Sequence, residues 1–535
     1  MYAQAARASA PLKIKDVKVI ATSPARQRWV FIKVLTSEDG LYGLGSANCA
    51  YLSWAVKAAI EKHMVPFWIG KEVDRIEDLW QSNYVRSYWR TGPVTNVIQA
   101  ALDSALWDIK GKRAGMPVHE LLGGKVRDAV PLYAHGSGNS SQACVENVQR
   151  FMAQGYRHVR IQMGGYGGGG FLPRATGSRP ENGFAGQAFD EELYVATISK
   201  LFLEIREKAG PEVKLLHDVH EHLTPTRALD LAKRLEPANM FFVEDILPPE
   251  QIDYFKQIRA QTTTPLAMGE LFTHPHEWRP LISERLIDFI RCRVGMIGDI
   301  TQARKIAALC EQFGVRTAWQ EGGENDPINQ LIAYHVDLTI PSFGIQEDNR
   351  FPAIVHEMMP GAAQIRGGYL YGSEKPGLGI DLNEEIAARF PLIDDARVSD
   401  WTTVRGVDGS LVKPSAVVKT LHCPVDIELL VDSQAEADHM AYCKSLAWQF
   451  QKEWRIVFPG DEPKKVKFPR ESLSAVILGY RFPEPQFDGL KQVLTNGGYR
   501  VDGLRAERVP QTNELGLINI GRIGPAESPS PGHAE

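Results

Sequence analysis

The feature that most constrains the fold is a regular alternation of short apolar runs with amphipathic stretches, from residue 130 to about residue 364. Stretches of helical periodicity, such as residues 225–236 and 299–314, separate most of the runs. Eight strands alternating with helices are typical of a closed barrel in which ligands bind where the strands end. We therefore predict an α/β protein built on a (β/α)₈ (TIM-like) barrel at 129–364. The eight predicted strands are residues 130–138, 158–165, 214–220, 241–246, 265–270, 288–294, 315–320 and 342–347.

The sequence on either side of the barrel has a different pattern of apolar residues. Residues 13–22 and 29–47 read as strands and residues 54–70 and 97–115 as helices, which predicts an α+β capping domain at 11–128, completed by about 365–413. A separate C-terminal α/β unit of unknown role is expected at 416–521, and the tail at 522–535 is expected to be disordered. Its predicted elements are strands at 425–433 and 474–482 and helices at 436–454 and 487–496.

Composition excludes several classes of partner and location. Lys plus Arg is 60 and Asp plus Glu is 65, so the net charge of −5 gives no reason to expect nucleic acid or an anionic membrane. No run reaches 18 apolar residues, and the N-terminus has no apolar core of signal-peptide length. The six cysteines form no CxxC pair, which fits a reducing cytoplasm. We expect a cytoplasmic protein.

Three carboxylates stand at the ends of three successive predicted strands. Asp218, Glu244 and Glu270 are each separated by 26 residues, the length of one βα unit. Adjacent strands lie about 4.8 Å apart, so these acids are expected around one point, where a hard divalent cation would offset their repulsion. Ligation by oxygen alone favours Mg²⁺ over zinc. The alternative is that the acids are solvated or paired with nearby Lys and Arg.

With this triad in view, the chain resembles the enolase superfamily in its mandelate racemase-like branch. The motifs are ALDSALWDIKGKRAGMPVHELLGG and GSEKPGLG. The mannonate/gluconate group of acid-sugar dehydratases is the most similar, through RSYWRTGPV, LLHDVHEHLTP, FFVEDILPPEQ, TPLAMGELF, LIDFIRCRVGMIGDIT and SFGIQE. The resemblance extends from about Lys13 to about Pro414 and does not reach the last 120 residues.

The resemblance implies a Mg²⁺-dependent lyase that dehydrates a sugar acid, such as D-mannonate or D-gluconate, to a 2-keto-3-deoxy acid through a metal-stabilised enediolate. It also implies a homo-oligomer. Two alternatives remain open. One is another reaction of the same superfamily, epimerisation or cycloisomerisation. The other is a relative with little or no activity that binds a metabolite.

The resemblance also assigns the groups that move protons. Arg160 matches the second-strand arginine that pairs with a tyrosine to form the base, since a guanidinium favours the phenolate. Tyr166 is the candidate tyrosine, although its loop, GGYGGGGF, differs from the family pattern and Tyr166 could instead be a loop residue. His220 matches the acid that expels the hydroxyl. It follows Asp218 by two residues, so on an extended strand both side chains would point to the same side.

The seventh strand departs from the family. Gln320 occupies the position of a family histidine, and an amide cannot shuttle a proton. Asp299, after the sixth strand, therefore has no obvious histidine to orient. Glu347, at the end of the eighth strand, matches a glutamate that contacts substrate, or is a surface acid. Asn48 and Trp89 match cap positions that face the substrate, although Trp89 could equally lie in the core of the cap. His135, His274 and His276 are expected to be loop residues or substrate contacts.

Overall fold

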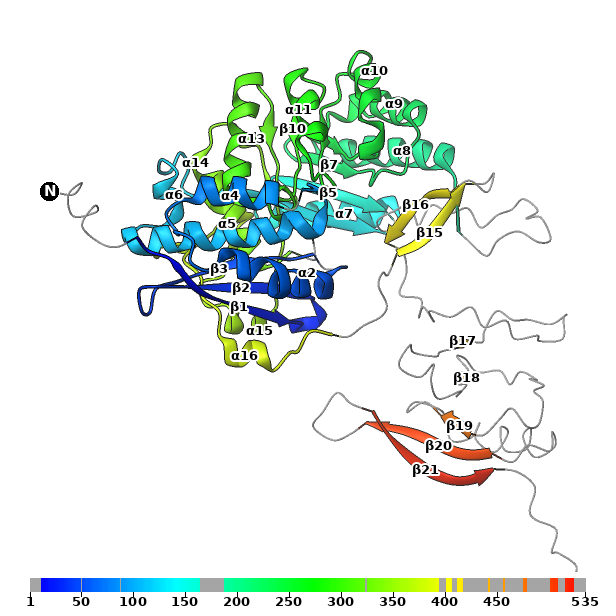
Figure 1. The fold of residues 1–535 in the computed structure, drawn as a ribbon. Coiled ribbons are helices and arrows are strands. Elements are labelled where there is room, and N and C mark those ends of the chain that lie inside the picture. The colour runs from blue at the N-terminus through cyan, green and yellow to red at the C-terminus, as the bar shows by residue number, and fades with distance from the viewer. Residues whose placement is uncertain are drawn as a thin grey trace, which may run out of the picture. The chain divides into compact units, whose positions relative to one another are not determined.

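The structure is a computed structural model. It describes residues 11–393 except 50, 87, 164–186 and 323–324. Beyond them it describes residues 401–406, 411–416, 441–442, 456–457, 475–478, 501–508 and 515–523. The chain divides into two compact units, residues 1–394 with 401–418 and residues 395–400 with 419–535 (Figure 1).

The N-terminal cap is an antiparallel three-stranded meander covered by helices. The strands β1 (Ile14–Thr22), β2 (Trp29–Thr36) and β3 (Tyr42–Ser46) pair in sequence order. The short helix η1 (Pro24–Arg26) lies between β1 and β2. After β3 the helices of the cap follow: α2 (Ser53–Ala59), the π-helix η2 (Ile60–Met64), α3 (Val65–Trp68), α4 (Ile76–Arg86), α5 (Pro93–Ala114) and α6 (Val118–Leu121).

Helix α5 packs directly on the backbone of β3, and two glycines make this approach possible. A Cβ atom on Gly43 would lie 2.0 Å from the Ala105 carbonyl oxygen, and one on Gly45 would lie 1.9 Å from that of Ala101. Both distances are far shorter than any van der Waals contact, so only glycine is compatible with this packing. The close approach fixes β3, and the cap segment that follows it, against the longest helix of the cap.

Eight parallel strands close into a barrel. They are β4 (Val130–Gly138), β5 (His158–Met163), β7 (Lys214–Asp218), β8 (Phe242–Glu244), β9 (Leu266–Met268), β10 (Phe289–Ile290), β11 (Arg316–Thr317) and β12 (Gln346–Glu347). Consecutive strands from β4 to β11 pair in parallel, β12 pairs with β4, and a parallel bridge between Thr317 and Phe343 joins the remaining edges. Each strand lies inside its predicted run, and the predicted barrel is confirmed.

Helices follow every strand of the barrel on its outside (Figure 1). They are α7 (Ser141–Ala153), α8 (Glu191–Ala209), α9 (Pro225–Arg234), η4 (Glu236–Ala238), η5 (Pro249–Tyr254), α10 (Phe255–Arg259), α11 (Pro275–Ser283), α12 (Val294–Ile297), α13 (Asp299–Phe313), α14 (Pro327–Thr339) and α15 (Ala353–Met358). Among the described residues no helix is both long and apolar enough to cross a membrane.

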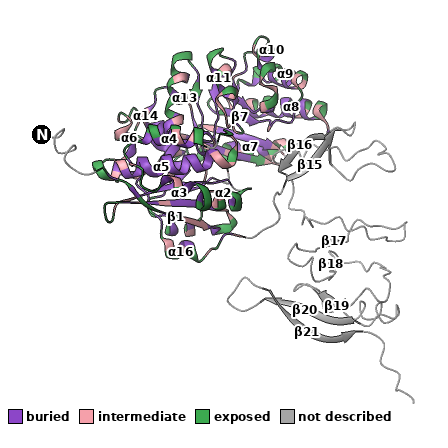
Figure 2. Ribbon diagram, in the orientation of Figure 1, coloured by how far each residue is buried: buried purple, intermediate pink, exposed green. Residues whose placement is uncertain are grey.

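The inside of the barrel is a packed core. Its buried side chains come from β4 and from β7 to β12, or from the residue beside those strands, and Figure 2 shows buried residues along the strands. A filled interior leaves the carboxyl ends of the strands as the place for polar chemistry. The core residues are Tyr133, Leu216, Phe242, Ala267, Phe289, Ala318 and Ile345.

After the barrel the chain first returns to the cap and then departs from the expected course. Strands β13 (Gln364–Arg366) and β14 (Tyr369–Tyr371) form a hairpin on β4, and α16 (Glu384–Ala388) contacts β1. Residues to about 413 were expected in the cap. Instead, β15 (Trp401–Gly406) pairs with β16 (Leu411–Ala416) and in parallel with β6 (Gln187–Phe189), which follows the second barrel strand.

In the second unit the structure describes strands only. β17 (Ala441–Tyr442) pairs with β18 (Ile456–Val457), and β20 (Val501–Arg508) pairs with β19 (Ala475–Leu478) and β21 (Leu515–Ile523). β19 lies in the strand expected at 474–482, whereas β17 falls inside the helix expected at 436–454. The strand expected at 425–433 and the helix expected at 487–496 lie outside the described residues.

Candidate active site

Two of the three predicted acids lie in register on neighbouring strands. Asp218 ends β7 and Glu244 ends β8, and the two residues are direct partners in the parallel ladder. Both side chains are buried. Glu270 lies two residues beyond Met268, the last residue of β9, and is partly exposed. The equal spacing of 26 residues therefore does not correspond to equal positions on three strands.

Asp245 holds the turn that carries Glu270. Its Oδ1 atom accepts a hydrogen bond from the Gly269 backbone N–H at 3.0 Å, and its own N–H donates to the Ala267 carbonyl at 3.0 Å. Gly269 has φ = 137°, a conformation that favours glycine. Burial raises the pKa of Asp245 to about 6. Glu244 is thus a candidate ligand, and Asp245 holds the turn that positions the next candidate ligand, Glu270.

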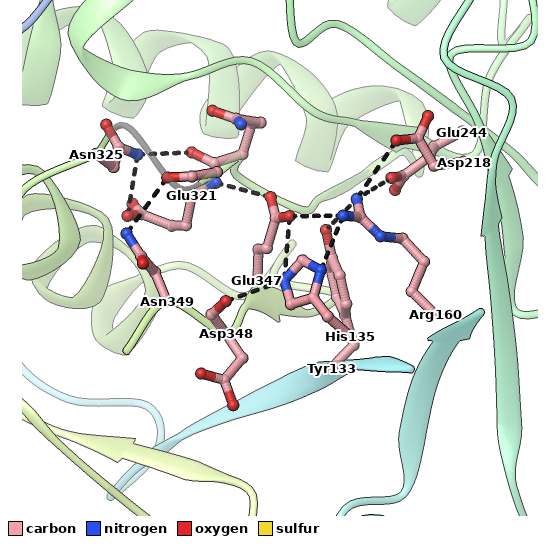
Figure 3. A network of polar contacts seen from close by, with 12 residues as sticks. Tyr133, His135, Arg160, Asp218, Glu244, Glu321, Asn325, Glu347, Asp348 and Asn349 are labelled. Carbon is pink, nitrogen blue, oxygen red and sulfur yellow. Dashed lines mark hydrogen bonds and ion pairs between the residues drawn. The ribbon is translucent and has the colours of Figure 1, made fainter. Parts of the chain in front are cut away.

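A buried arginine on β5 connects two of the acids with the eighth strand (Figure 3). Arg160 Nη1 contacts Glu244 Oε1 and lies 3.8 Å from Asp218 Oδ2. Arg160 Nη2 lies 3.2 Å from Glu347 Oε1 and 2.9 Å from His135 Nδ1. His135 is the neighbour of Arg160 in the β4–β5 ladder. Arg160 therefore lies between the acids of β7 and β8 and the residues of β4 and β12.

A second arginine, Arg291, is fully buried directly after β10. Its Nε atom lies 3.1 Å from Glu244 Oε2, its Nη2 atom 3.5 Å from Glu270 Oε2, and its Nη1 atom 3.2 Å from Glu347 Oε2. Nη1 also donates a hydrogen bond of 2.9 Å to the Tyr133 hydroxyl. Together the two guanidinium groups contact all three predicted metal ligands.

These charges set the protonation of the buried groups. Burial, with the charge of Glu244, raises the pKa of Asp218 well above its usual value. Burial also favours the neutral form of Glu347, but the guanidinium groups of Arg291 and Arg160 hold its pKa well below the usual range. The pKa of His135 is lowered to about 4, by burial and then by the charge of Arg160. Glu347 is therefore an anion and His135 neutral near pH 7.

The oxygen atoms of Asp218, Glu244 and Glu270 are ligands that suit a hard cation. The three side chains are not arranged around a common point, as they would be around a bound ion. Asp218 Oδ2 and Glu244 Oε2 are buried and accept no hydrogen bond from the described residues. All three acids offer oxygen ligands, which Mg²⁺ prefers. Within the described part of the chain, however, no group of three or more His, Cys, Asp or Glu side chains is placed to hold a metal ion. Each of the three acids lies instead beside a guanidinium.

His220 lies near the acids, although the alternation argument for it was wrong. The strand β7 ends at Asp218, and His220 lies in a turn with φ = 54°. Its backbone N–H donates to Asp218 Oδ1 at 2.8 Å, and its ring is stacked on His222 with 5.8 Å between centroids. A left-handed turn, and not an extended strand, therefore brings His220 beside Asp218.

Residues 318–321, which follow the seventh strand, are buried. The Gln320 backbone N–H donates to the Cys292 carbonyl at 3.1 Å, and its buried side-chain Oε1 has no partner among the described residues. The next residue, Glu321, donates its backbone N–H to Glu347 Oε2 at 2.8 Å (Figure 3). Glu347 is 1% exposed, so the surface-acid alternative is wrong. Asp299 is buried at the start of α13, where burial and the charge of Asp103 raise its pKa.

The cap contributes one buried candidate and one exposed one. Asn48 follows β3 and is buried. Trp89 is 82% exposed and makes an edge contact with Tyr88 at 5.4 Å between centroids, so a place in the core of the cap is wrong. Tyr166 lies outside the described residues.

Sequence reasoning overlooked Arg291 and Tyr133 and left His135 among the loop residues. His135 lies within β4, where it binds Arg160 and lies 3.0 Å from the Asp348 carbonyl. The available signal was a polar residue at the carboxyl end of an apolar run, which DFIRCRV and VPLYAHGSG both contain. His274 is a loop residue, as expected, and caps α11, whereas His276 lies in the first turn of α11, so a place in a loop is wrong for it.

A barrel with an N-terminal meander cap and acids at the ends of the third, fourth and fifth strands is the architecture of the enolase superfamily. Residues 3–123 match the mandelate racemase/muconate lactonizing enzyme N-terminal domain, and residues 143–386 match the enolase C-terminal domain-like family. The predicted resemblance is thereby confirmed.

Named relatives narrow the family further. A D-galactonate dehydratase family member of Paenibacillus sp. (strain JDR-2) is 48% identical over 406 residues, which are 75% of this chain and all of the relative. Another from Salmonella enteritidis PT4 is 45% identical over 75% of this chain and 99% of the relative. The chain belongs to the D-galactonate dehydratase family. This membership confirms the predicted acid-sugar dehydratase at the level of the family.

Solved structures agree with this membership. A crystal structure described as an enolase from Pantoea ananatis with bound D-gluconate and Mg has a TM-score of 0.72 and 44% identity, covering 75% of this chain and all of that chain. A putative dehydratase from Zymomonas mobilis ZM4 has a TM-score of 0.60 and 26% identity, over 70% of this chain and 97% of that chain.

Proposed function

We propose that the chain catalyses Mg²⁺-dependent dehydration of a hexonate, such as D-mannonate or D-gluconate, to a 2-keto-3-deoxy acid. The observation that carries the proposal is the meeting of Asp218, Glu244 and Glu270 at two buried arginines where three neighbouring barrel strands end. Further support comes from the relatives named for D-galactonate and from the Pantoea ananatis protein with bound D-gluconate and Mg.

In this proposal the three acids hold Mg²⁺, which when bound stabilises the negative charge that develops on the substrate carboxylate as the neighbouring proton is removed. Tyr166, with its phenolate favoured by Arg160, takes the proton from C2. His220 donates a proton to the hydroxyl on C3, which leaves as water while the electron pair of the C2–H bond forms a C2–C3 double bond. The resulting enol tautomerises to the 2-keto-3-deoxy acid.

The remaining candidates are proposed to hold the substrate. Asn48 of the cap, Gln320 and Glu347 are all buried and polar, so they can orient hydroxyl groups of a sugar acid in a site that excludes water. The 82% exposure of Trp89 does not support the same role for that residue. We also propose that the protein assembles as a homo-oligomer, as the resemblance implies.

The test is turnover of the purified full chain with Mg²⁺ on a panel of hexonic and pentonic acids, measured as 2-keto acid formation. Formation of a 2-keto-3-deoxy acid that stops on addition of EDTA supports the proposal. If Mg²⁺ binds by calorimetry and no acid of the panel loses water, the dehydration is refuted. A product formed without loss of water identifies epimerisation or cycloisomerisation.

Gln320 favours a second candidate, a relative that binds a sugar acid with little or no turnover. The buried Gln320 amide replaces a histidine of the family and cannot transfer a proton. Tight binding of a sugar acid without any product supports this candidate. Turnover at an ordinary enzymatic rate, roughly 1 s⁻¹ or more, eliminates it.

A further inference from the structure

The Arg160 guanidinium contacts two separate sets of groups, and Figure 3 shows it between them. On one side, Nη1 contacts the predicted metal ligand Glu244 at Oε1 and lies 3.8 Å from Asp218 Oδ2. On the other side, Nη2 lies 3.2 Å from Glu347 Oε1 and 2.9 Å from His135 Nδ1. The Arg160 side chain therefore contacts both the acids of the predicted metal site and the pair of His135 on the first strand and Glu347 on the eighth.

The first set of contacts places a positive charge where a cation bound to Glu244 would lie. Mg²⁺ binds carboxylate oxygens at about 2.0–2.1 Å, so a cation on Oε1 would lie next to the guanidinium that already contacts this oxygen. Two positive groups that share one oxygen also repel each other strongly in a buried site. Arg291 Nε faces the other oxygen, Glu244 Oε2, at 3.1 Å. A cation on either oxygen of Glu244 therefore meets a guanidinium, and at Oε1 that guanidinium is the one of Arg160.

The second set of contacts gives Arg160 a place to remain. Glu347 is buried and is held by the Glu321 backbone N–H at 2.8 Å, so its carboxylate stays in position whether or not Arg160 also binds Glu244. His135 is fixed by the Asp348 carbonyl at 3.0 Å. A buried guanidinium that loses Glu244 thus keeps one charged and one polar partner, which offsets the cost of staying buried.

We propose that Arg160 exchanges partners when a divalent cation binds, leaving Glu244 and remaining with Glu347 and His135. Arg160 then acts as a counterion to the acids before the cation enters and is free of them afterwards. The inference rests on the proposed function only for the assignment of Asp218, Glu244 and Glu270 as ligands. It adds that this arginine sets the affinity of the site for the cation.

The experiment measures Mg²⁺ affinity by calorimetry on the EDTA-treated full chain, for the wild type, Arg160→Met and Arg350→Met. Removal of the competing guanidinium should tighten Mg²⁺ binding about tenfold in Arg160→Met. Arg350, whose side chain is 58% exposed and pairs with Asp348, is the matched control, and its loss should change affinity less than about twofold. A gain of less than about threefold in folded Arg160→Met, or weaker binding, overturns the inference.

Crystallography of the wild type keeps the inference testable if Arg160→Met does not fold. In crystals grown with Mg²⁺, Arg160 Nη1 should have moved out of hydrogen-bond distance of Glu244 while Nη2 still contacts Glu347. An Arg160–Glu244 hydrogen bond that persists with the cation on all three acids refutes the exchange. No Mg²⁺ binding by the wild type would instead refute the proposed function, so the two failures can be told apart.

Discussion

Replacing Glu244 with glutamine tests the metal site most directly, because the amide has the same size as the carboxylate but carries no charge and replaces one acceptor oxygen with an NH₂ donor. Glu244 is the acid that contacts both Arg160 and, through Oε2 at 3.1 Å, Arg291. Each arginine keeps Glu347 at 3.2 Å. We therefore expect a loss of unfolding free energy of about 3 kcal/mol, the lower end of the cost of breaking a buried ion pair.

The effect of Glu244→Gln on the cation should be larger. Loss of one of three ligand charges should weaken Mg²⁺ binding at least about 100-fold, which corresponds to roughly 2.7 kcal/mol, and should abolish dehydration. Calorimetric titration with MgCl₂ and 2-keto acid formation measure the two effects, and chemical denaturation measures the stability.

The matched control for Glu244→Gln is Glu61→Gln. Glu61 forms a partly exposed ion pair with Lys57 at 2.6 Å on one face of a helix, worth about 0.3–0.5 kcal/mol. This control should keep the Mg²⁺ affinity and the activity of the wild type. If folded Glu244→Gln binds Mg²⁺ as the wild type does, the assignment of Glu244 as a ligand is wrong, whatever the activity.

Three further predictions concern other parts of the first unit, which holds the cap and the barrel. Gln320→His should change the rate or the substrate preference on the sugar-acid panel, and unchanged values of both would place this position outside the active site. Gly45→Ala should lower the unfolding free energy by more than about 2 kcal/mol in urea denaturation, because its Cβ would meet the Ala101 carbonyl at 1.9 Å, and a loss below about 0.5 kcal/mol would contradict the close packing. Burial lowers the pKa of His335 from 6.5 to about 4 in the folded protein. As the pH drops from about 6.5 to 4, His335 therefore takes up a proton in the unfolded chain but not in the folded one, and the free energy of unfolding falls. His335→Gln should remove about 1–3 kcal/mol of that pH dependence relative to the wild type, and identical slopes would refute it.

The sequence predicted the barrel well because its signal is local and repeated. Each observed strand lies inside a predicted apolar run, since a buried parallel strand needs apolar side chains on both faces. Asp218 and Glu244 were found for the same reason, because they end such runs. The spacing rule failed at Glu270, where the chain turns through Gly269 before the acid, and spacing alone cannot reveal a turn of positive φ.

The parts of the site that the sequence did not reveal depend on contacts between distant segments. Arg291 is one charged residue among many in the sequence, and only the closed barrel brings it to Glu244 and Glu347. The exposure of Trp89 likewise depends on how its loop leaves the cap. The resemblance supplied the roles of Arg160 and His220, and the structure adds which atoms they contact.

The pairing of β6 with β15 changes what a minimal fragment of this protein is. β6 lies between the second barrel strand and helix α8, and its partner comes from residues 401–406, about 200 positions later in the chain. A fragment ending at residue 393 would contain the whole barrel by sequence and still leave β6 without the one described strand that pairs with it. The shortest fragment that keeps all the described strand pairs of the first unit ends at residue 416. The strands β15 and β16 are therefore part of the first unit and not a linker that can be removed together with the second unit.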